Sequence, residues 1–285
     1  MIGGGVMSDV VRALKSPLRR IKRRVMLEVN LPTNFGKTDI IHLIARRLGL
    51  RDYLEICTTT TGNCYAEINR GQFRSSRRLM YNCPDGYDDA LPVDLRIADL
   101  DIDPALATIE PGSIDICLVD GWHTYECAIR DLTGAYNLLP EGGALVVHDC
   151  LPTSEALAAP QWVQGEWCGV SHRAFLDFVL ARRDLDFCTI DIDYGCGIIF
   201  KNRAISLADD TLPAHDRTYE RTDLAAGWFA HHDDDSAAFK FFMDNHRELL
   251  RLIPARTFVR KLNGAAAGPS PADPARPHPE TALNF

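Results

Sequence analysis

Two short apolar segments of the chain are each followed by side chains that can transfer protons or ligate a divalent ion. Ile114–Val119 precedes Asp120 and His123, and Ala144–Val147 precedes His148 and Asp149. Aspartate and histidine are the usual residue types for acid–base catalysis and for metal binding. The alternative is structural, with the two aspartates capping the adjoining segments and the histidines making local hydrogen bonds.

The elements around these residues predict where the four side chains lie. The two segments are apolar on both faces and are separated by a helical stretch, as in a parallel sheet covered on both sides. In such sheets, ligands bind outside the carboxyl ends of the strands. We therefore expect all four side chains in one crevice.

The rest of the chain continues this alternation of strands and helices. We expect helices over 38–48, from Asn63, from Thr124 and over 171–180. The expected strands are 53–57, 76–81, 95–98, 114–119, 144–147, 187–192 and 197–201. This order predicts an α/β fold, with a Rossmann-like, doubly wound, mostly parallel seven-stranded sheet that carries helices on both faces.

Four regions follow from composition. Residues 1–33 form a basic N-terminal segment, 34–203 the Rossmann-like domain, 204–263 a helical C-terminal region, and 264–285 a tail rich in Ala, Pro and Gly that we expect to be disordered. The basic segment could lie on an anionic membrane or on a partner. We favour a solvated helix that balances an acidic body.

Bulk properties exclude several function classes. The net charge of −8 argues against nucleic acid as a partner, and no apolar run is long enough to span a bilayer. No apolar leader opens the chain, so we expect a cytoplasmic protein. The nine cysteines show no CxxC pairing, which favours reduced, buried thiols over disulfides or a zinc site. These properties leave open whether the protein forms a homo-oligomer.

Three segments of the sequence resemble a known family. They are YLEICTTTTGN (53–63), DICLVDGWHTYECAIRDL (115–132) and LLPEGGALVVHDC (138–150). Together they resemble class I methyltransferases that use S-adenosylmethionine (SAM), nearest to the macrolide-sugar O-methyltransferase and cephalosporin-hydroxylase-like group. The resemblance spans roughly 35–201. The chain departs from the family's glycine loop, because Cys57 and Thr61 stand at two glycine places and Gly62 comes one residue late.

The resemblance implies a binding site for SAM. It places Glu55 at the ammonium of the methionine moiety and Asp99 at the adenosine. The alternatives are that Glu55 is a loop or capping carboxylate and that Asp99 is a solvated turn acid. The full set of implied cofactor residues is Glu55, Thr58, Gly62, Asn63, Asp99 and Asp120.

The resemblance also implies catalytic and metal-binding roles. Asp120, His148 and Asp149 match positions that carry a divalent ion in the macrolide-sugar enzymes, and magnesium or manganese would suit them. His123 matches the general base of those enzymes, although it could instead cap the helix at Thr124. We therefore expect SAM-dependent methyl transfer to a hydroxyl of a small-molecule acceptor, such as a sugar or glycosylated natural product. The alternatives are a non-catalytic ligand-binding protein and a metal-dependent, hydroxylase-like enzyme that no longer uses SAM.

Overall fold

The computed structural model describes residues 31–59, 64–84, 87, 90–182, 185–202, 205, 220–231 and 234–265. The expectations for the first thirty residues, for Gly62 and Asn63, and for the tail after Ala265 fall outside these residues.

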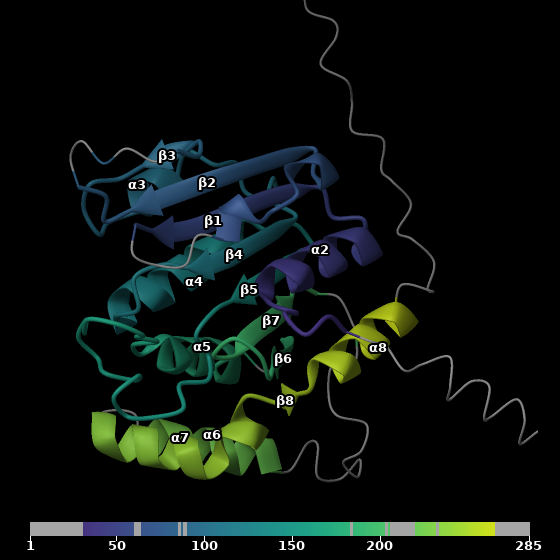
Figure 1. Ribbon diagram of the computed structural model, residues 1–285. Helices are drawn as coiled ribbons and strands as arrows, with labels where there is room; N and C mark the ends of the chain where they lie inside the picture. The colour runs from purple at the N-terminus through teal and green to yellow at the C-terminus, as the bar shows by residue number, and fades with distance from the viewer. Residues whose placement is uncertain are drawn as a thin grey trace, which may run out of the picture.

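A twisted sheet forms the centre of the molecule (Figure 1). Its strand order is β3–β2–β1–β4–β5–β7–β6–β8, and β7 runs antiparallel to both of its neighbours while the other pairs are parallel. The strands are β1 (Asp52–Thr58), β2 (Ser75–Tyr81), β3 (Leu95–Arg96), β4 (Ile116–Asp120), β5 (Ala144–Val147), β6 (Asp186–Ile190), β7 (Cys196–Phe200) and β8 (Leu252–Ile253). This order confirms the Rossmann-like, mostly parallel fold.

The sheet has eight strands rather than the expected seven. The additional strand is β8, which pairs in parallel with β6 through Thr189–Leu252 and Ile190–Ile253. It comes from the C-terminal region, whose described residues otherwise lie mainly in helices.

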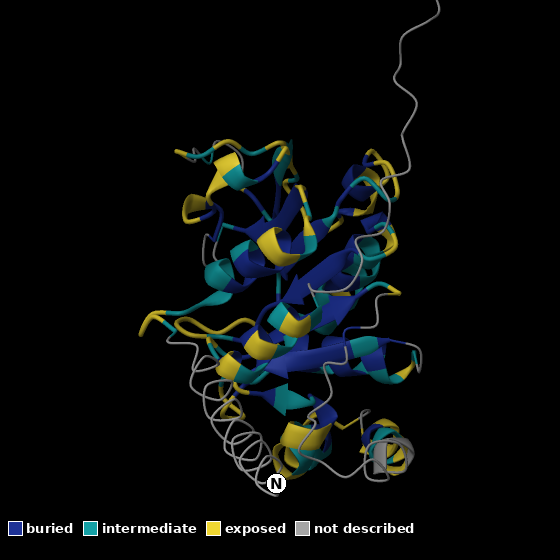
Figure 2. Cartoon of the chain, turned by 90° about the vertical axis from the view of Figure 1, so that its right-hand side faces the viewer, coloured by how far each residue is buried: buried dark blue, intermediate teal, exposed yellow. Residues whose placement is uncertain are grey.

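Helices cover both faces of the sheet, as expected. They are α2 (Lys37–Leu48), α3 (Asp103–Leu106), α4 (Tyr125–Leu138), α5 (Ser171–Leu180), α6 (Glu220–His231), α7 (Asp235–Leu249) and α8 (Ala255–Ala265). Apolar residues of α2 and α8 share one buried cluster, whereas those of α3 to α7 share the other. Figure 2 shows the strands buried between these layers, with exposed residues on the outer helices.

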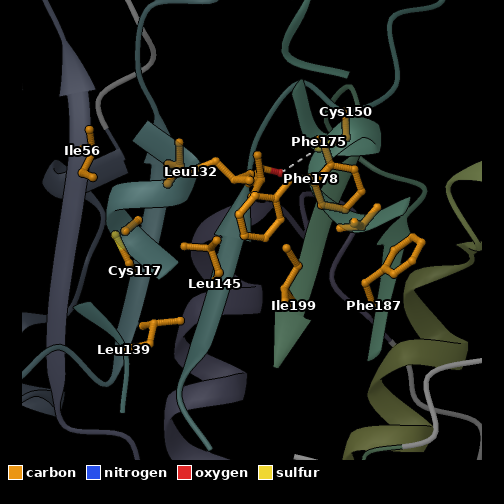
Figure 3. Close-up of a cluster of buried hydrophobic side chains, with 14 of the residues drawn as sticks. Ile56, Cys117, Leu132, Leu139, Leu145, Cys150, Phe175, Phe178, Phe187 and Ile199 are labelled. Carbon is orange, nitrogen blue, oxygen red and sulfur yellow. Dashed lines mark hydrogen bonds between the residues drawn. The ribbon is translucent and has the colours of Figure 1, made fainter. Parts of the chain in front are cut away.

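The alternation of side chains along each strand divides the core in this way. In β1, Tyr53 faces the layer of α2, while Leu54 and Ile56 face the opposite layer. Figure 3 shows the second cluster, where Leu132 of α4 and Phe175 of α5 lie over the sheet. All residues of β4 and β5 are buried, which is why these strands are apolar on both sides.

Several local expectations need correction. The helix expected from Asn63 is replaced by two short 3-10 helices, η1 (Cys64–Ala66) and η2 (Arg70–Gln72). The third strand is only two residues long. The first strand, expected over 53–57, spans Asp52–Thr58, so that Glu55 lies at its centre.

The state of the cysteines and the lengths of the helices also bear on the expectations from the sequence. All nine cysteines are buried and none is in a disulfide, as expected. Among the described helices, none combines the length and the apolar character that crossing a membrane requires.

Candidate active site

The ends of β4 and β5 bring the predicted side chains together. Asp120 is the last residue of β4, and His148 and Asp149 directly follow β5, which is its parallel neighbour. All three residues and His123 are buried. Asp149 has a φ of 58°, a left-handed conformation that is uncommon for a residue with a Cβ and costs energy. The fold thus holds the backbone of Asp149 in an unfavourable conformation at the place where its carboxylate joins the cluster.

His123 faces the two carboxylates with one ring nitrogen. Its Nε2 lies 3.3 Å from Asp149 Oδ2 and 3.6 Å from Asp120 Oδ1. Its Nδ1 lies 2.8 Å from the carbonyl oxygen of Trp167, which can only accept, so Nδ1 carries a proton. One ligand atom from each of Asp120, His123 and Asp149 lies within 4.8 Å of the others. This spacing could hold a cation.

His148 lies on the other side of the same carboxylates. Its Nδ1 is 3.4 Å from Asp120 Oδ1 and 3.3 Å from Asp149 Oδ2. Its Nε2 is 3.3 Å from a carboxylate oxygen of Asp193 in the turn between β6 and β7. The three residues expected to bind metal therefore lie together, although the group of ligand atoms with a spacing suited to a metal contains His123 in place of His148.

Burial and mutual attraction set the charges of this cluster. Burial would raise the pKa of Asp120, but His148 and Lys37 outweigh it and hold that pKa well below its usual range. Burial would likewise lower the pKa of His123 and of His148, but the neighbouring carboxylates raise both. The cluster therefore favours an ionised Asp120 beside protonated imidazoles in the absence of a bound ion.

Lys37 is a member of the cluster that the sequence analysis missed. Its Nζ donates to Asp120 Oδ2 at 2.8 Å and lies 3.4 Å from Nδ1 of His148. It is the first residue of α2, whose start is fixed because the Gly36 N–H donates to Asp39 Oδ2 at 3.0 Å. The only sequence signal was a lysine directly before the predicted helix, which is equally typical of a solvated side chain.

A buried hydrogen-bond network supports the turn that carries His123. The Tyr81 hydroxyl donates to Oδ2 of Asp131 and accepts from the Trp122 N–H. Arg130 donates to Oδ1 of Asp131 at 2.8 Å. A Cβ on Gly121 would overlap with the Asp131 carboxylate and the Tyr81 hydroxyl. Only glycine therefore fits between Asp120 and the rest of this turn.

The segment after β5 packs against the ring and the backbone of His123. The Trp167 ring packs 5.2 Å from the imidazole and 5.2 Å from the Trp122 ring, measured between centroids. The Val170 N–H donates to the His123 carbonyl oxygen at 2.9 Å. At Gly169, with a φ of 55°, a Cβ would overlap with the His123 backbone. These contacts fix both the ring and the backbone of His123.

Glu55 and Thr58 lie in β1, beside the cluster. Glu55 is fully buried, and its Oε2 accepts from the Tyr53 hydroxyl at 2.9 Å. Its Oε1 is buried without a hydrogen-bond partner among the residues that the structure describes. Burial raises the pKa of Glu55 to about 7, and Tyr53 opposes the shift. Thr58 ends the strand and is also buried.

Asp99 is not brought into the cluster by any contact in the described parts of the chain. Its side chain is exposed and accepts from the Asp101 N–H at 3.0 Å. Its carbonyl oxygen accepts from the Asn82 N–H at 2.9 Å, which joins the loop to the end of β2. These contacts are those of a turn residue.

A cavity of about 520 Å³ lies beside the amino end of α2. Lys37 and Asp193 belong both to its lining and to the carboxylate cluster, so the two features adjoin. Thr38, His42 and Glu67 add further polar groups to the lining. Its volume is in the range of small-molecule sites.

Comparison with known proteins gives one family match. Residues 41–150 match the family described as a methyltransferase domain. The match begins in α2 and ends directly after Asp149, so it contains most of the cluster and covers less than half of the chain. It confirms that this segment resembles methyltransferases. A comparison with curated proteins gives no match.

Solved structures of methyltransferases are similar at low identity. The O-methyltransferase TomG from Streptomyces achromogenes, in complex with SAM, is 20% identical over 63% of this chain and 86% of that chain, with a TM-score of 0.44. The O-methyltransferase from Bacillus cereus, in complex with SAH, is 14% identical over 70% and 93%, with a TM-score of 0.43. The fold assignment therefore rests on strand order and direction in this chain.

Proposed function

We propose that the protein is a SAM-dependent O-methyltransferase that acts on a hydroxyl of a small molecule. The observation that supports this most directly is the position of His123 within the matched domain. Its Nδ1–H is held by the Trp167 carbonyl, so Nε2 is the ring nitrogen that faces the cluster. A cation bound to the neighbouring carboxylates would favour the neutral imidazole, which can then accept the proton of an acceptor hydroxyl.

Glu55 supports SAM as the cofactor. A buried carboxylate oxygen without a hydrogen-bond partner among the described residues can accept a hydrogen bond from the ammonium of a methionine group. Bound SAM would supply an electrophilic methyl group. In this proposal Thr58, Gly62, Asn63, Asp99 and Asp120 complete the cofactor site. The protein's main contribution to the rate is alignment of the acceptor oxygen with that methyl group.

The donor set also fits a magnesium or manganese ion. Asp120 and Asp149 offer carboxylate oxygens, and His148 Nδ1 lies within 3.4 Å of both. We assign the ion to these three residues, which leaves His123 available as the base. A bound ion would lower the pKa of the acceptor hydroxyl.

The cavity beside α2 supports a polyhydroxylated acceptor, such as a sugar. Its lining offers hydroxyl, imidazole, carboxylate and ammonium groups, from Thr38, His42, Glu67 and Lys37. Such groups satisfy the donors and acceptors of a sugar, whereas a planar aromatic acceptor would leave many of them without partners.

Calorimetry with SAM and with its demethylated product tests the cofactor assignment. Binding of both is expected; if neither binds, the proposal is wrong, and retained metal binding would then favour the hydroxylase-like alternative.

A variant of His123 tests the general base. With an acceptor identified, His123→Gln should lower kcat by about 10²–10⁴-fold, as loss of a general base does. His246→Gln is a matched control, because His246 Nδ1 also contacts a carbonyl oxygen, that of Met243 at 2.9 Å, on the surface. Loss of bound metal in His123→Gln would make His123 a ligand instead.

A further inference from the structure

Lys37 places a permanent positive charge inside the carboxylate cluster. Its ammonium donates to Asp120 Oδ2 at 2.8 Å, and its side chain is only 14% exposed. The remaining oxygen of Asp120, Oδ1, faces His123 and His148 at 3.6 Å and 3.4 Å. Asp120 can therefore offer one oxygen to a metal ion while Lys37 holds the other.

The position of α2 does not depend on this ion pair. Its start is fixed by the bond from the Gly36 N–H to Asp39, and Ile40, Ile41 and Ile44 are fully buried against the sheet. Lys37 thus projects from an element that apolar packing already holds in place. An ammonium that is held at a metal ligand repels a divalent ion.

We propose that Lys37 is a tethered cation that competes with the divalent ion for Asp120 and keeps the metal affinity of the cluster low. The inference builds on the proposed metal site and adds a residue that controls it. It explains why a chain with two buried aspartates at one site also directs a lysine to one of them. A weakly held ion can exchange during turnover, whereas the cluster keeps one fixed compensating charge at all times.

Manganese binding to three proteins tests the proposal. Calorimetry would compare the wild-type protein with Lys37→Met and with the control Lys240→Met. Lys240 makes the same kind of pair, with Asp244 at 2.8 Å, on the exposed face of α7. We expect Lys37→Met to bind Mn²⁺ about tenfold more tightly or better, since 1.4 kcal/mol already gives tenfold. The control should bind as the wild type does.

Two further variants keep the test decisive if Lys37→Met folds poorly. Lys37→Gln retains a donor for Asp120 without the charge and should also bind Mn²⁺ more tightly. Lys37→Arg retains the charge and should keep the weak affinity. Equal or weaker binding in the neutral variants would overturn the proposal, as would absence of Mn²⁺ binding in all of them. SAM binding, measured without metal, reports on the proposed function separately.

Discussion

Replacing Asp131 by asparagine should change how the stability of the fold depends on pH. The Asp131 carboxyl is fully buried in α4, beneath the turn that carries His123. Burial raises its pKa from 3.8 to about 6, although hydrogen bonds from Tyr81 and Arg130 oppose the shift. An acid with a raised pKa stabilises the folded state fully below its unfolded pKa, and this contribution is lost as the pH rises through the folded pKa.

The expected magnitude follows from these two values. A change from 3.8 to about 6 corresponds to about 3 kcal/mol, because each pKa unit is worth about 1.4 kcal/mol. Urea unfolding of the wild type and of Asp131→Asn would be measured at several pH values from acid to neutral. The wild-type free energy of unfolding minus that of the variant should fall by about 3 kcal/mol between pH 3.8 and neutrality.

Subtracting the variant's free energy of unfolding from that of the wild type removes the contribution of groups that titrate alike in both proteins. A difference that stays constant with pH would show that Tyr81 and Arg130 balance burial, and one that rises with pH would show that they outweigh it; either result would refute the reasoning. Tyr81→Phe offers an internal check. Loss of its hydroxyl bond should move the pKa of Asp131 further up, and the step in stability should move to higher pH.

Three further predictions concern the turn, the cofactor site and the metal site. Gly121→Ala should cost about 1–3 kcal/mol in urea unfolding through overlap with its buried neighbours, whereas Gly264→Ala, with open space around it, should not. SAM affinity measured by calorimetry should fall as the pH drops below about 7, because Glu55 must be ionised to bind an ammonium; Glu55→Gln should lose this dependence, and a dependence that persists there would contradict the assignment. Asp120→Asn should sharply reduce bound Mn²⁺ in a metal assay, and unchanged content would exclude Asp120 as a ligand.

The strands that form the site could be predicted because strands buried on both faces consist mostly of apolar residues. Residues 116–119 and 144–147 are apolar on both faces, and the rule for ligand sites in parallel sheets then places Asp120, His148 and Asp149 together. This prediction needs only the local sequence patterns and the order of the strands. No long-range contact had to be known.

Other parts could not be predicted because they depend on contacts between distant residues. Lys37 meets Asp120 and His148 across 83 and 111 positions of sequence, and a lysine at a helix start has no signal of burial. Asp193 stands in a turn, where an acid is ordinary. Strand β8 has only two residues, too few to show a period. Pairing with β6, and not local propensity, makes it a strand.

The position of β8 and α8 also has a consequence for synthesis of the protein. Phe258, Val259 and Leu262 of α8 pack with residues of α2 in one cluster, and β8 covers the edge of β6. A nascent chain that ends before Leu252 would expose that strand edge, which is a template for pairing with other chains. The helix that begins with Lys37 leaves the ribosome early, but α8, which shares its buried cluster, follows much later. Folding of this layer can therefore be completed only after residues 252–265 have left the ribosome.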